Sequence, residues 1–311
     1  RLVPTVDRYR AIRGNSTVGT RSIGICIDDK LRNTGTHSRF IDGIVLGDGF
    51  QLDEAAASIL ALGQYSERTH HDRLLETHRD AILLLRDRLS SRFDPPTGLY
   101  STLQDSQDDY QKLPFITYDN VLAWQALLDL AGIFVRMNDP SEAQVMRQRA
   151  YALKRAILKY CVSEGTPGAS GTIFASATDG KKSIFTEIPP GSLMKLPALG
   201  FLSVDDPLFV RTYDCLHSRN YAYSYSDQPY GLPGSYRLPF TTSWCVADHL
   251  LLPRGKDLAL RILRESRWDG GIITEGVKPS SAVMDLQRRA FATVAGYVAH
   301  AICKSYCAPQ K

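Results

Sequence analysis

The chain has 311 residues, of which 43% are hydrophobic and 23% are charged, and its formal net charge is +4. This composition is typical of a globular protein, and no apolar run approaches the length of a membrane span. The Lys and Arg residues are scattered along the chain, so we expect neither a nucleic-acid partner nor a membrane partner.

Apolar residues at helical spacing recur in pairs along the chain. The pattern predicts helices over 53–69 and 72–90, joined by a short hinge at 70–71, and over 117–137 and 141–162, joined at 138–140. It also predicts shorter helices over 192–199 and 207–217, over 241–251 and 255–268, and a last helix over 289–307. Residues 1–48 show no helical pattern, and we expect them to be irregular.

Four long segments separate the helix pairs and are rich in Gly, Pro, Asp and aromatic residues: 91–116, 164–191, 218–239 and 269–288. Long loops are uncommon in compact domains and tend to be functional. If each pair is an antiparallel hairpin, the hinges lie at one end of the hairpins and the long loops at the other. The sequence therefore predicts an all-α fold, a ring of helical hairpins forming one catalytic domain over 1–311, with one elaborated face.

The first long loop leads into the segment SQDDYQKLPFITYDN, residues 106–120, which places Asp108 beside Asp109. A neighbouring like charge and apolar aromatic surroundings both disfavour ionisation, and this is how a carboxyl group is kept protonated as a general acid. The alternative is a solvated loop, or a carboxylate that caps the helix beginning near Thr117.

The last long loop reads WDGGIITEGVKPSSAV and contains Glu275 after a glycine turn. A single carboxylate presented in this way is suited to activate water as a general base. The alternative is a surface glutamate near Lys278. Two carboxyl groups on either side of a glycosidic bond are what hydrolysis with inversion requires.

The two middle loops have the composition of a sugar-binding surface. One contains Asp179 and Glu187, and the other is rich in tyrosine, including Tyr225 and Tyr236. Aromatic faces among polar groups suit a sugar ring, whose C–H face is apolar. The alternative is that these tyrosines pack the loop against the protein. Asp53, near the start of the first helix, either contacts sugar or caps that helix.

The six cysteines form no CxxC pair and no zinc-type Cys/His spacing, so we expect neither a metal nor another cofactor. Cys303 and Cys307 are one helical turn apart, which favours two small apolar residues on one helix face. The lack of a disulfide framework favours a reducing compartment, and we expect the cytoplasm. Because the chain begins at Arg1, we expect further sequence upstream.

Four segments occur in an order that resembles glycoside hydrolase family 125, the metal-independent exo-α-1,6-mannosidases. They read FQLDEA, SQDDYQKLPFITYDN, FASATDGKKSIFTEIPPGSLMKLPALGF and ITEG. Glucoamylases resemble the chain more distantly. The resemblance implies an (α/α)6 toroid and an inverting glycosidase without metal, in which Asp108 or Asp109 is the acid and Glu275 is the base. It implies an oligosaccharide or glycan substrate. We expect this substrate to be bound by Asp53, Tyr118, Asn120, Asp179, Glu187, Tyr225 and Tyr236.

The chain also departs from the family. The early Trp-Leu-Arg-Asp-Ser motif has no counterpart in residues 1–48, and the Ser-Pro-His-Thr stretch is replaced by GLPGSYRLPFTTSW, which has no histidine. Two other functions therefore stay open: an α-glucosidase of the glucoamylase type, and a non-catalytic sugar-binding protein on the same toroid. The sequence does not predict an oligomeric state.

Overall fold

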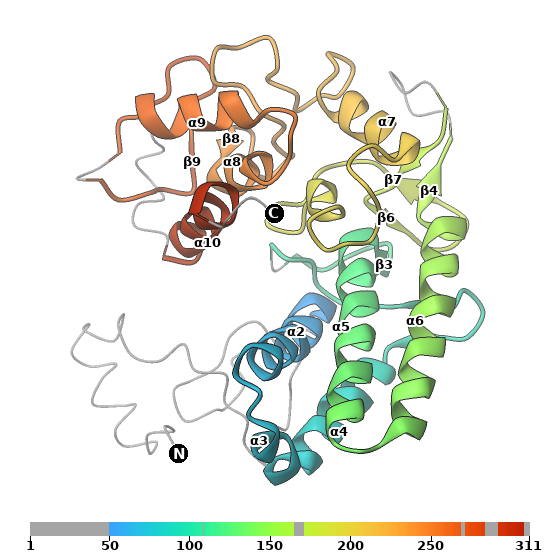
Figure 1. Ribbon diagram of the computed structural model, residues 1–311. Helices are drawn as coiled ribbons and strands as arrows, with labels where there is room; N and C mark the ends of the chain where they lie inside the picture. The colour runs from blue at the N-terminus through green and yellow to red at the C-terminus, as the bar shows by residue number, and fades with distance from the viewer. Residues whose placement is uncertain (1–49, 108, 165–170, 269–270, 284–291, 308–311) are drawn as a thin grey trace, which may run out of the picture. The chain divides into compact units, whose positions relative to one another are not determined.

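The computed structural model describes residues 50–107, 109–164, 171–268, 271–283 and 292–307 (Figure 1). The chain divides into two compact units, Arg1–Ile157 and Leu158–Lys311. The segment 1–48, expected to be irregular, lies outside the described residues, and one catalytic domain over 1–311 stays a prediction.

The first unit is built from helical hairpins (Figure 1). Its helices are α2 Leu52–Thr69, α3 Asp72–Thr77, α4 Arg79–Ser90, α5 Thr117–Arg136 and α6 Pro140–Tyr160, whose end lies in the second unit. A helix with apolar residues around most of its circumference is buried among others. This is the case for α5, which packs against α2 and buries Leu127, Leu130 and Phe134.

Two ion pairs join the hinge regions of the first unit. Arg79 Nη2 lies 2.5 Å from Asp139 Oδ2, and Arg136 Nε lies 2.6 Å from Asp72 Oδ1. His70, at the end of α2, has a left-handed backbone with φ of 51°. The ends of α2 and α5 therefore lie together, as antiparallel hairpins require.

Short strands lie at the opposite ends of these helices. β1 Phe93–Asp94 and β2 Leu99–Tyr100 form a hairpin, in which Phe93 pairs with Tyr100. β3 Phe115–Ile116 leads directly into α5. The residues between β2 and β3 form the loop that contains the predicted acid.

The second unit combines strand pairs with short helices. The pairs are β4 Val162–Ser163 with β5 Ile173–Phe174, β6 Ala177–Thr178 with β7 Ser183–Ile184, and β8 Thr241–Thr242 with β9 Gly276–Val277. The helices are α7 Pro207–Leu216, α8 Ser243–Leu250, α9 Lys256–Glu265 and α10 Ala292–Ile302, followed by a π-helical turn, Cys303–Cys307.

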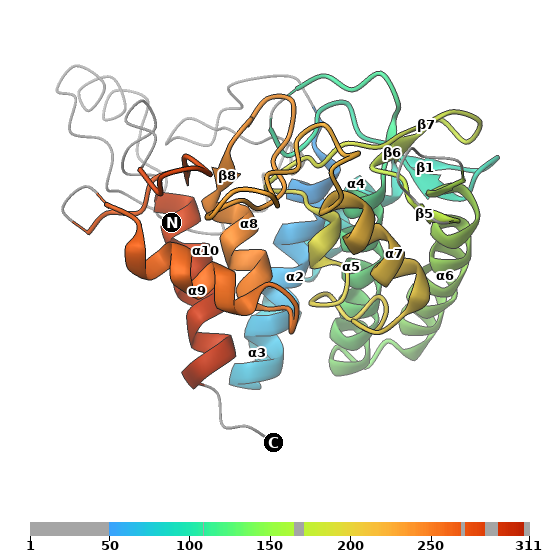
Figure 2. The same cartoon turned by 90° about the horizontal axis from the view of Figure 1, so that it is seen from above.

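The core of the second unit forms around α8, which packs against both α9 and α10 (Figures 1 and 2). Every residue of α8 is buried, and its apolar side chains meet Ile262 of α9 and Val294 and Val298 of α10. The turn before α9 requires glycine: Gly255 has φ of 79°, and a Cβ there would lie 2.5 Å from the ring of His249.

The helix predictions agree with the structure to within a few residues except in three places. The helix predicted over 72–90 is two helices that meet at His78. Only a 3₁₀ turn, Leu193–Lys195, forms within 192–199, because Pro197 has no N–H to continue a helix. The helix predicted over 241–251 is preceded by strand β8 at residues 241–242. Cys303 and Cys307 lie in one helical turn, and both are exposed. Residues 289–291 lie outside the described part.

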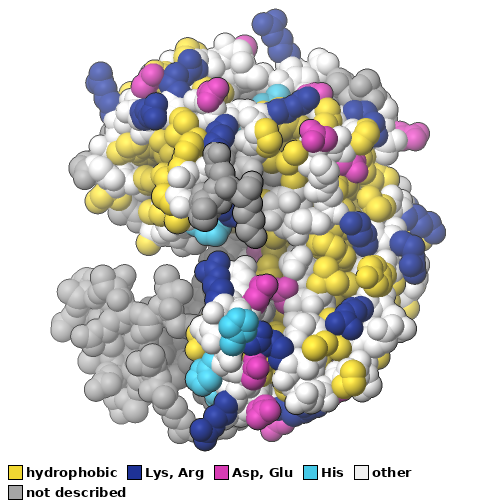
Figure 3. Space-filling model, in the orientation of Figure 1, with side chains coloured by type: hydrophobic (Ala, Val, Ile, Leu, Met, Phe, Trp, Pro, Cys, Tyr) yellow, Lys and Arg dark blue, Asp and Glu magenta, His cyan; other side chains and the backbone are white. Residues whose placement is uncertain are grey.

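None of the helices that the structure describes is both long and apolar enough to span a membrane. On the face seen in Figure 3, side chains of Lys and Arg alternate with those of Asp and Glu among the described residues. This mixed pattern agrees with the scattered charge in the sequence.

Candidate active site

The acid loop, residues 101–114, is attached to the start of α2. The backbone N–H groups of Leu103 and Gln104 both donate to the carbonyl oxygen of Phe50, over 3.0 and 3.2 Å. Asp53 lies in the first turn of α2, directly after this attachment. The same short segment therefore positions both Asp53 and the acid loop.

Asp105 holds the tip of the acid loop. Its Oδ1 accepts hydrogen bonds from the backbone N–H groups of Gln107 and Asp109, over 2.8 and 3.1 Å, and its Oδ2 accepts one from Gln111 Nε2 over 2.6 Å. The residue is 1% exposed. Three donors on one buried carboxylate favour its ionised form. Sequence reasoning missed Asp105, although an Asp just ahead of a polar turn is a recognised turn signal.

Of the two candidate acids, Asp109 is half-buried at the end of this tether, and its carbonyl oxygen accepts the N–H of Asp105 over 2.9 Å. Asp108 lies outside the described residues. Which of the two donates a proton therefore stays open.

The first turn of α5 contains a carboxyl group that the sequence analysis did not select, that of Asp119. It is fully buried, and neither of its oxygens has a hydrogen-bond partner among the described residues. Burial raises the pKa of Asp119 well above its ordinary value, and the charges of Asp53 and Asp105 raise it further. In the sequence, Asp119 lies between Tyr118 and Asn120, which were predicted to bind substrate, and this position could have indicated it.

The side chain of Asn120 is held by backbone groups. Its Nδ2 donates to the carbonyl oxygens of Tyr100 and Ile116, both over 2.9 Å, and its Oδ1 accepts the N–H of Tyr100 over 2.8 Å. These bonds use both amide hydrogens. Asn120 therefore joins β2 to α5 and has no hydrogen left to donate to a sugar. Tyr118 is half-buried beside it.

In the second unit, backbone pairing positions Glu275. Thr242 of β8 pairs with Gly276 of β9, and the N–H of Ser243, the first residue of α8, donates to the carbonyl oxygen of Glu275 over 2.7 Å. On the other side of Glu275, buried Thr274 donates from Oγ1 to Gly276 over 2.9 Å. The side chain of Glu275 is half-buried. We call residues 271–283 the Glu275 loop.

Glu187 is buried in the second unit, at 3% exposure. Its Oε1 accepts the N–H of Leu193 over 3.2 Å, and its own N–H donates to Tyr221 Oη over 2.9 Å. Burial raises the pKa of Glu187 to about 7, and the charge of Asp248 adds to the effect. A carboxyl group with this pKa exchanges protons near neutral pH.

Asp248 of α8 forms a buried carboxyl pair with Glu187. Its Oδ1 accepts the hydroxyl of Tyr297 over 2.6 Å. Burial raises the pKa of Asp248 to about 6, and the positive charge of Lys195 opposes this rise. Lys195 Nζ lies 4.3 Å from the ring centroid of Tyr297. The pair in this unit therefore has a cation within electrostatic reach.

The other predicted sugar contacts differ in their surroundings. Tyr225 is half-buried. A Cβ at Gly231 would lie 1.4 Å from the carbonyl oxygen of Tyr225, so the tyrosine loop, residues 218–239, packs closely on itself. Tyr236 is 53% exposed and accessible to a ligand.

Asp179 is exposed in the turn between β6 and β7. Its Oδ1 accepts the N–H groups of Lys182 and Lys181, over 2.6 and 2.8 Å, and these bonds lower its pKa. One oxygen of the carboxylate is therefore part of the turn. That Asp179 binds sugar stays a prediction.

A buried histidine pair joins α7 to α8. His217 Nε2 and His249 Nε2 lie 2.9 Å apart, and each Nδ1 lies 2.7 Å from a carbonyl oxygen, that of Tyr213 or Cys245. Burial lowers the pKa of His217 to about 4 and that of His249 to about 3. Both rings are therefore uncharged near neutral pH.

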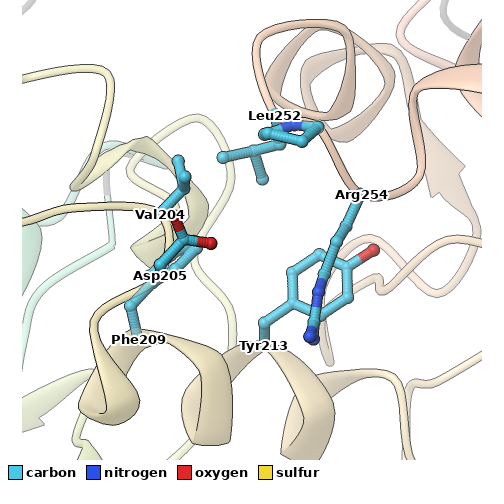
Figure 4. A pocket seen from close by; sticks show the side chains of 7 residues that line it. Val204, Asp205, Phe209, Tyr213, Leu252 and Arg254 are labelled. Carbon is cyan, nitrogen blue, oxygen red and sulfur yellow. The ribbon is translucent and has the colours of Figure 1, made fainter.

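A small pocket lies where the start of α7 meets the turn between α8 and α9 (Figure 4). Val204, Asp205, Phe209, Tyr213, Leu252, Pro253 and Arg254 line it, and none of them was predicted to bind substrate. It is therefore not the candidate active site. Within the described ranges, no three His, Cys, Asp or Glu side chains are grouped to hold a metal ion.

Comparison with solved structures shows the fold. A Streptococcus pneumoniae protein described as a metal-independent α-mannosidase, in a non-productive complex with α-1,6-mannobiose, is 15% identical, with a TM-score of 0.71 over 96% of this chain and 78% of that one. A bacterial glucoamylase complexed with acarbose is 18% identical, with a TM-score of 0.64 over 87% of this chain and 42% of that one. The fold is thus all-α, of the six-hairpin glycosidase type, as the sequence predicts.

A further structure, described as a wild-type glycosidase, is 16% identical, with a TM-score of 0.56 over 96% of this chain and 76% of that one. A search of curated proteins gave no significant match. The model of the family described as metal-independent alpha-mannosidase (GH125) matches residues 51–303. The matched span includes the acid loop and the Glu275 loop.

Proposed function

Because this chain belongs to the metal-independent α-mannosidase family, it is a glycoside hydrolase, and we propose that it releases a terminal α-linked mannose with inversion of configuration. The observation that supports this proposal is the family match, which runs from the start of α2 to the end of α10 and includes both candidate carboxylate loops. The relative from Streptococcus pneumoniae was studied with α-1,6-mannobiose, so an α-1,6-linked mannoside is the first substrate to test.

In the proposed mechanism, the acid loop supplies the general acid and the Glu275 loop supplies the general base of inverting hydrolysis. Asp108 or Asp109 donates a proton to the leaving oxygen as the bond to the anomeric carbon breaks. Glu275 takes a proton from a water molecule whose oxygen forms the new bond from the opposite face. The proton from water stays on Glu275 until solvent removes it, and the product has the inverted configuration.

The remaining predicted residues would bind the sugar. Asp53 lies beside the acid loop, and Tyr118 follows it at the start of α5. Tyr236 is exposed and suited to contact the apolar face of a sugar ring, and Tyr225 belongs to the same loop. Glu187 is buried, so we propose that it positions the residues that contact the sugar and does not itself contact the sugar.

The test is the substitution Glu275→Gln, assayed on α-mannosides and α-glucosides. Loss of a general base lowers the rate by about 10²- to 10⁴-fold, and we expect kcat to fall in this range with mannose binding preserved. Glu76→Gln, at an exposed site in α3, is the matched control and should keep full activity. Full activity of Glu275→Gln would exclude the mechanism, and hydrolysis of α-glucosides alone would favour the glucoamylase type.

Two further experiments determine the stereochemistry and the acid. NMR of the first sugar released from an α-mannoside should show the β-anomer, and an α-anomer would exclude inversion. Asp108→Asn and Asp109→Asn should be compared on alkyl and nitrophenyl mannosides. An activated nitrophenyl group leaves without a proton, so the variant that lacks the acid loses much more activity on the alkyl substrate.

A further inference from the structure

Asp119 poses a question of charge that the proposed mechanism does not answer. The group is fully buried in the first turn of α5, without a hydrogen-bond partner on either oxygen among the described residues. An ionised carboxylate in such a place has lost its hydration without forming hydrogen bonds to replace it, which costs several kcal/mol. The neutral acid form avoids most of this cost.

The elements around Asp119 add negative charge. α2 contributes Asp53, and the acid loop contributes Asp105, and both act on Asp119 electrostatically. β2 contributes Tyr100, which is buried and neutral because burial raises its pKa. Among the described residues, the charged groups that act on Asp119 are thus both acids, and both favour a proton on Asp119.

Asp105 depends on being ionised, in contrast to Asp119. Its two oxygens accept three hydrogen bonds, two of them from the backbone of Gln107 and Asp109. A charged Asp119 would repel the Asp105 carboxylate. Asp105 would then either take up a proton or move away, and both changes weaken the bonds that shape the loop tip.

We propose that Asp119 is a positioning residue: its carboxyl group, kept in the acid form, allows the Asp105 carboxylate to hold the loop that presents Asp108 and Asp109. The effect of Asp119 on catalysis rests on the proposed function. Its effect on the order of the acid loop does not depend on that function. Asp119 is completely buried, so it touches no substrate and acts through Asp105.

The proposal predicts that raising the pH opens the acid loop. As Asp119 loses its proton, the tether fails and the loop loses order before the protein unfolds. Catalysis then falls as the pH rises through the raised pKa of Asp119, for a reason separate from the proton of the catalytic acid. Asp119→Asn removes this event, because an amide has nearly the same shape as the protonated acid and never ionises.

The experiment is hydrogen–deuterium exchange of the acid-loop peptide in the wild type and in Asp119→Asn, compared at equal pH across the range in which the protein stays folded. We expect equal protection at the acid end of this range, followed by a loss of protection at least tenfold greater in the wild type as the pH rises through the raised pKa of Asp119. Asp129→Asn is the matched control, because Asp129 lies on the same helix and its pKa is also raised, to about 6, mainly by burial. It should behave like the wild type.

Thermal unfolding gives a second measurement. The advantage of Asp119→Asn over the wild type should grow with pH, since the wild type loses stability as pH rises through the raised pKa of Asp119. If Asp119→Asn folds poorly, Asp119→Ser, which is small and neutral, should show the same resistance to pH at a lower melting temperature.

Equal loop exchange in the wild type and Asp119→Asn at every pH would overturn the proposal, as would an open loop in Asp119→Asn at the acid end of the range. Neither measurement requires a substrate, so the result does not depend on whether the enzyme is a mannosidase. If it is, kcat of Asp119→Asn should stay within about threefold of wild type at the optimum and persist to higher pH.

Discussion

The acid loop and the Glu275 loop are held in different ways. In the acid loop, one buried side chain, Asp105, accepts three hydrogen bonds and organises the turn. In the Glu275 loop, the backbone is held by the β8–β9 pair and by the N–H of Ser243 at the start of α8. A side-chain tether depends on its charge and can be removed by one substitution. A backbone tether is independent of pH and is sensitive mainly to shape.

The buried carboxyl groups of the two units also differ in the charges that surround them. In the first unit, the electrostatic influences on Asp119 come from two further acids. In the second unit, Glu187 and Asp248 have the cation Lys195 within reach, and their pKa values rise only to about 7 and about 6. Alkaline pH and charge substitutions should therefore affect the acid loop more than the Glu275 loop.

The largest expected effect is that of Asp105→Ala. It leaves three donors without their acceptor, two of them backbone N–H groups, and each unsatisfied buried group costs about 1–3 kcal/mol. We expect the free energy of unfolding to fall by about 3 kcal/mol or more and kcat/KM to fall by at least about 100-fold, the size of a general acid contribution. Denaturant unfolding and steady-state kinetics measure the two effects.

The matched control is Asp94→Ala. Asp94 Oδ2 also accepts bonds in a turn of the first unit, from Thr97 N–H over 3.0 Å and Thr97 Oγ1 over 2.6 Å. It lies in the β1–β2 hairpin, outside the acid loop. This variant should lose stability and keep its activity. If Asp105→Ala also keeps its activity, the side-chain tether does not position the acid.

The next largest effect should come from Gly276→Ala, which tests the backbone tether by shape. A Cβ at this position would lie 2.4 Å from ring atoms of Phe240 and 2.6 Å from the carbonyl oxygen of Thr241. Overpacking of this kind costs about 1–3 kcal/mol. We expect that loss in the free energy of unfolding and about a tenfold fall in kcat, because Glu275 is the preceding residue.

Gly296→Ala in α10 is the control, since a Cβ there meets no atom within 4 Å. Alanine is the better helix former, so this variant should be slightly more stable. Unchanged stability in Gly276→Ala would mean that the β8–β9 pair is more adaptable than a backbone tether should be.

The sequence predicts the helical hairpins well because their apolar spacing is local information. α5 and α6 begin and end within a few residues of the predicted bounds. The exceptions have local causes as well, such as Pro197, which prevents a helix after Leu193–Lys195. What the spacing does not contain is the loop structure, because loop positions depend on hydrogen bonds between residues far apart in the chain.

The sequence predicts which types of residue the candidate site contains, but it does not predict the role of each residue. Asn120 and Asp179 were expected to bind sugar, and the structure uses both in backbone contacts. Asp105 and Asp119 were missed, because the value of a buried carboxyl group depends on which donors and charges surround it in three dimensions. Glu187 was named, yet its burial beside Asp248 follows only from the packing around α8.

A smaller effect is expected at Glu187, which tests the claim that the second unit tolerates charge better. Its pKa is raised from the ordinary 4.5 to about 7. A raised pKa gives stability that is fully present below pH 4.5 and is lost as pH rises through 7, by at most about 1.4 kcal/mol per pH unit. Glu187→Gln should remove this loss, so its unfolding free energy should depend less on pH than that of wild type. An unchanged pH dependence would mean that Glu187 is ionised throughout this range.

The smallest expected effect is confined to acid and concerns the pair His217 and His249. Their pKa values are lowered from the ordinary 6.5 to about 4 and about 3, so their contribution to stability is fully present above pH 6.5 and is lost as pH falls through these values. His217→Gln keeps a polar group opposite His249 and removes one titration. Its acid loss, followed by unfolding between pH 7 and 3, should therefore be about half that of wild type, while exposed His71→Gln should match wild type. A full acid loss in His217→Gln would mean that the acid sensitivity does not come from this histidine pair.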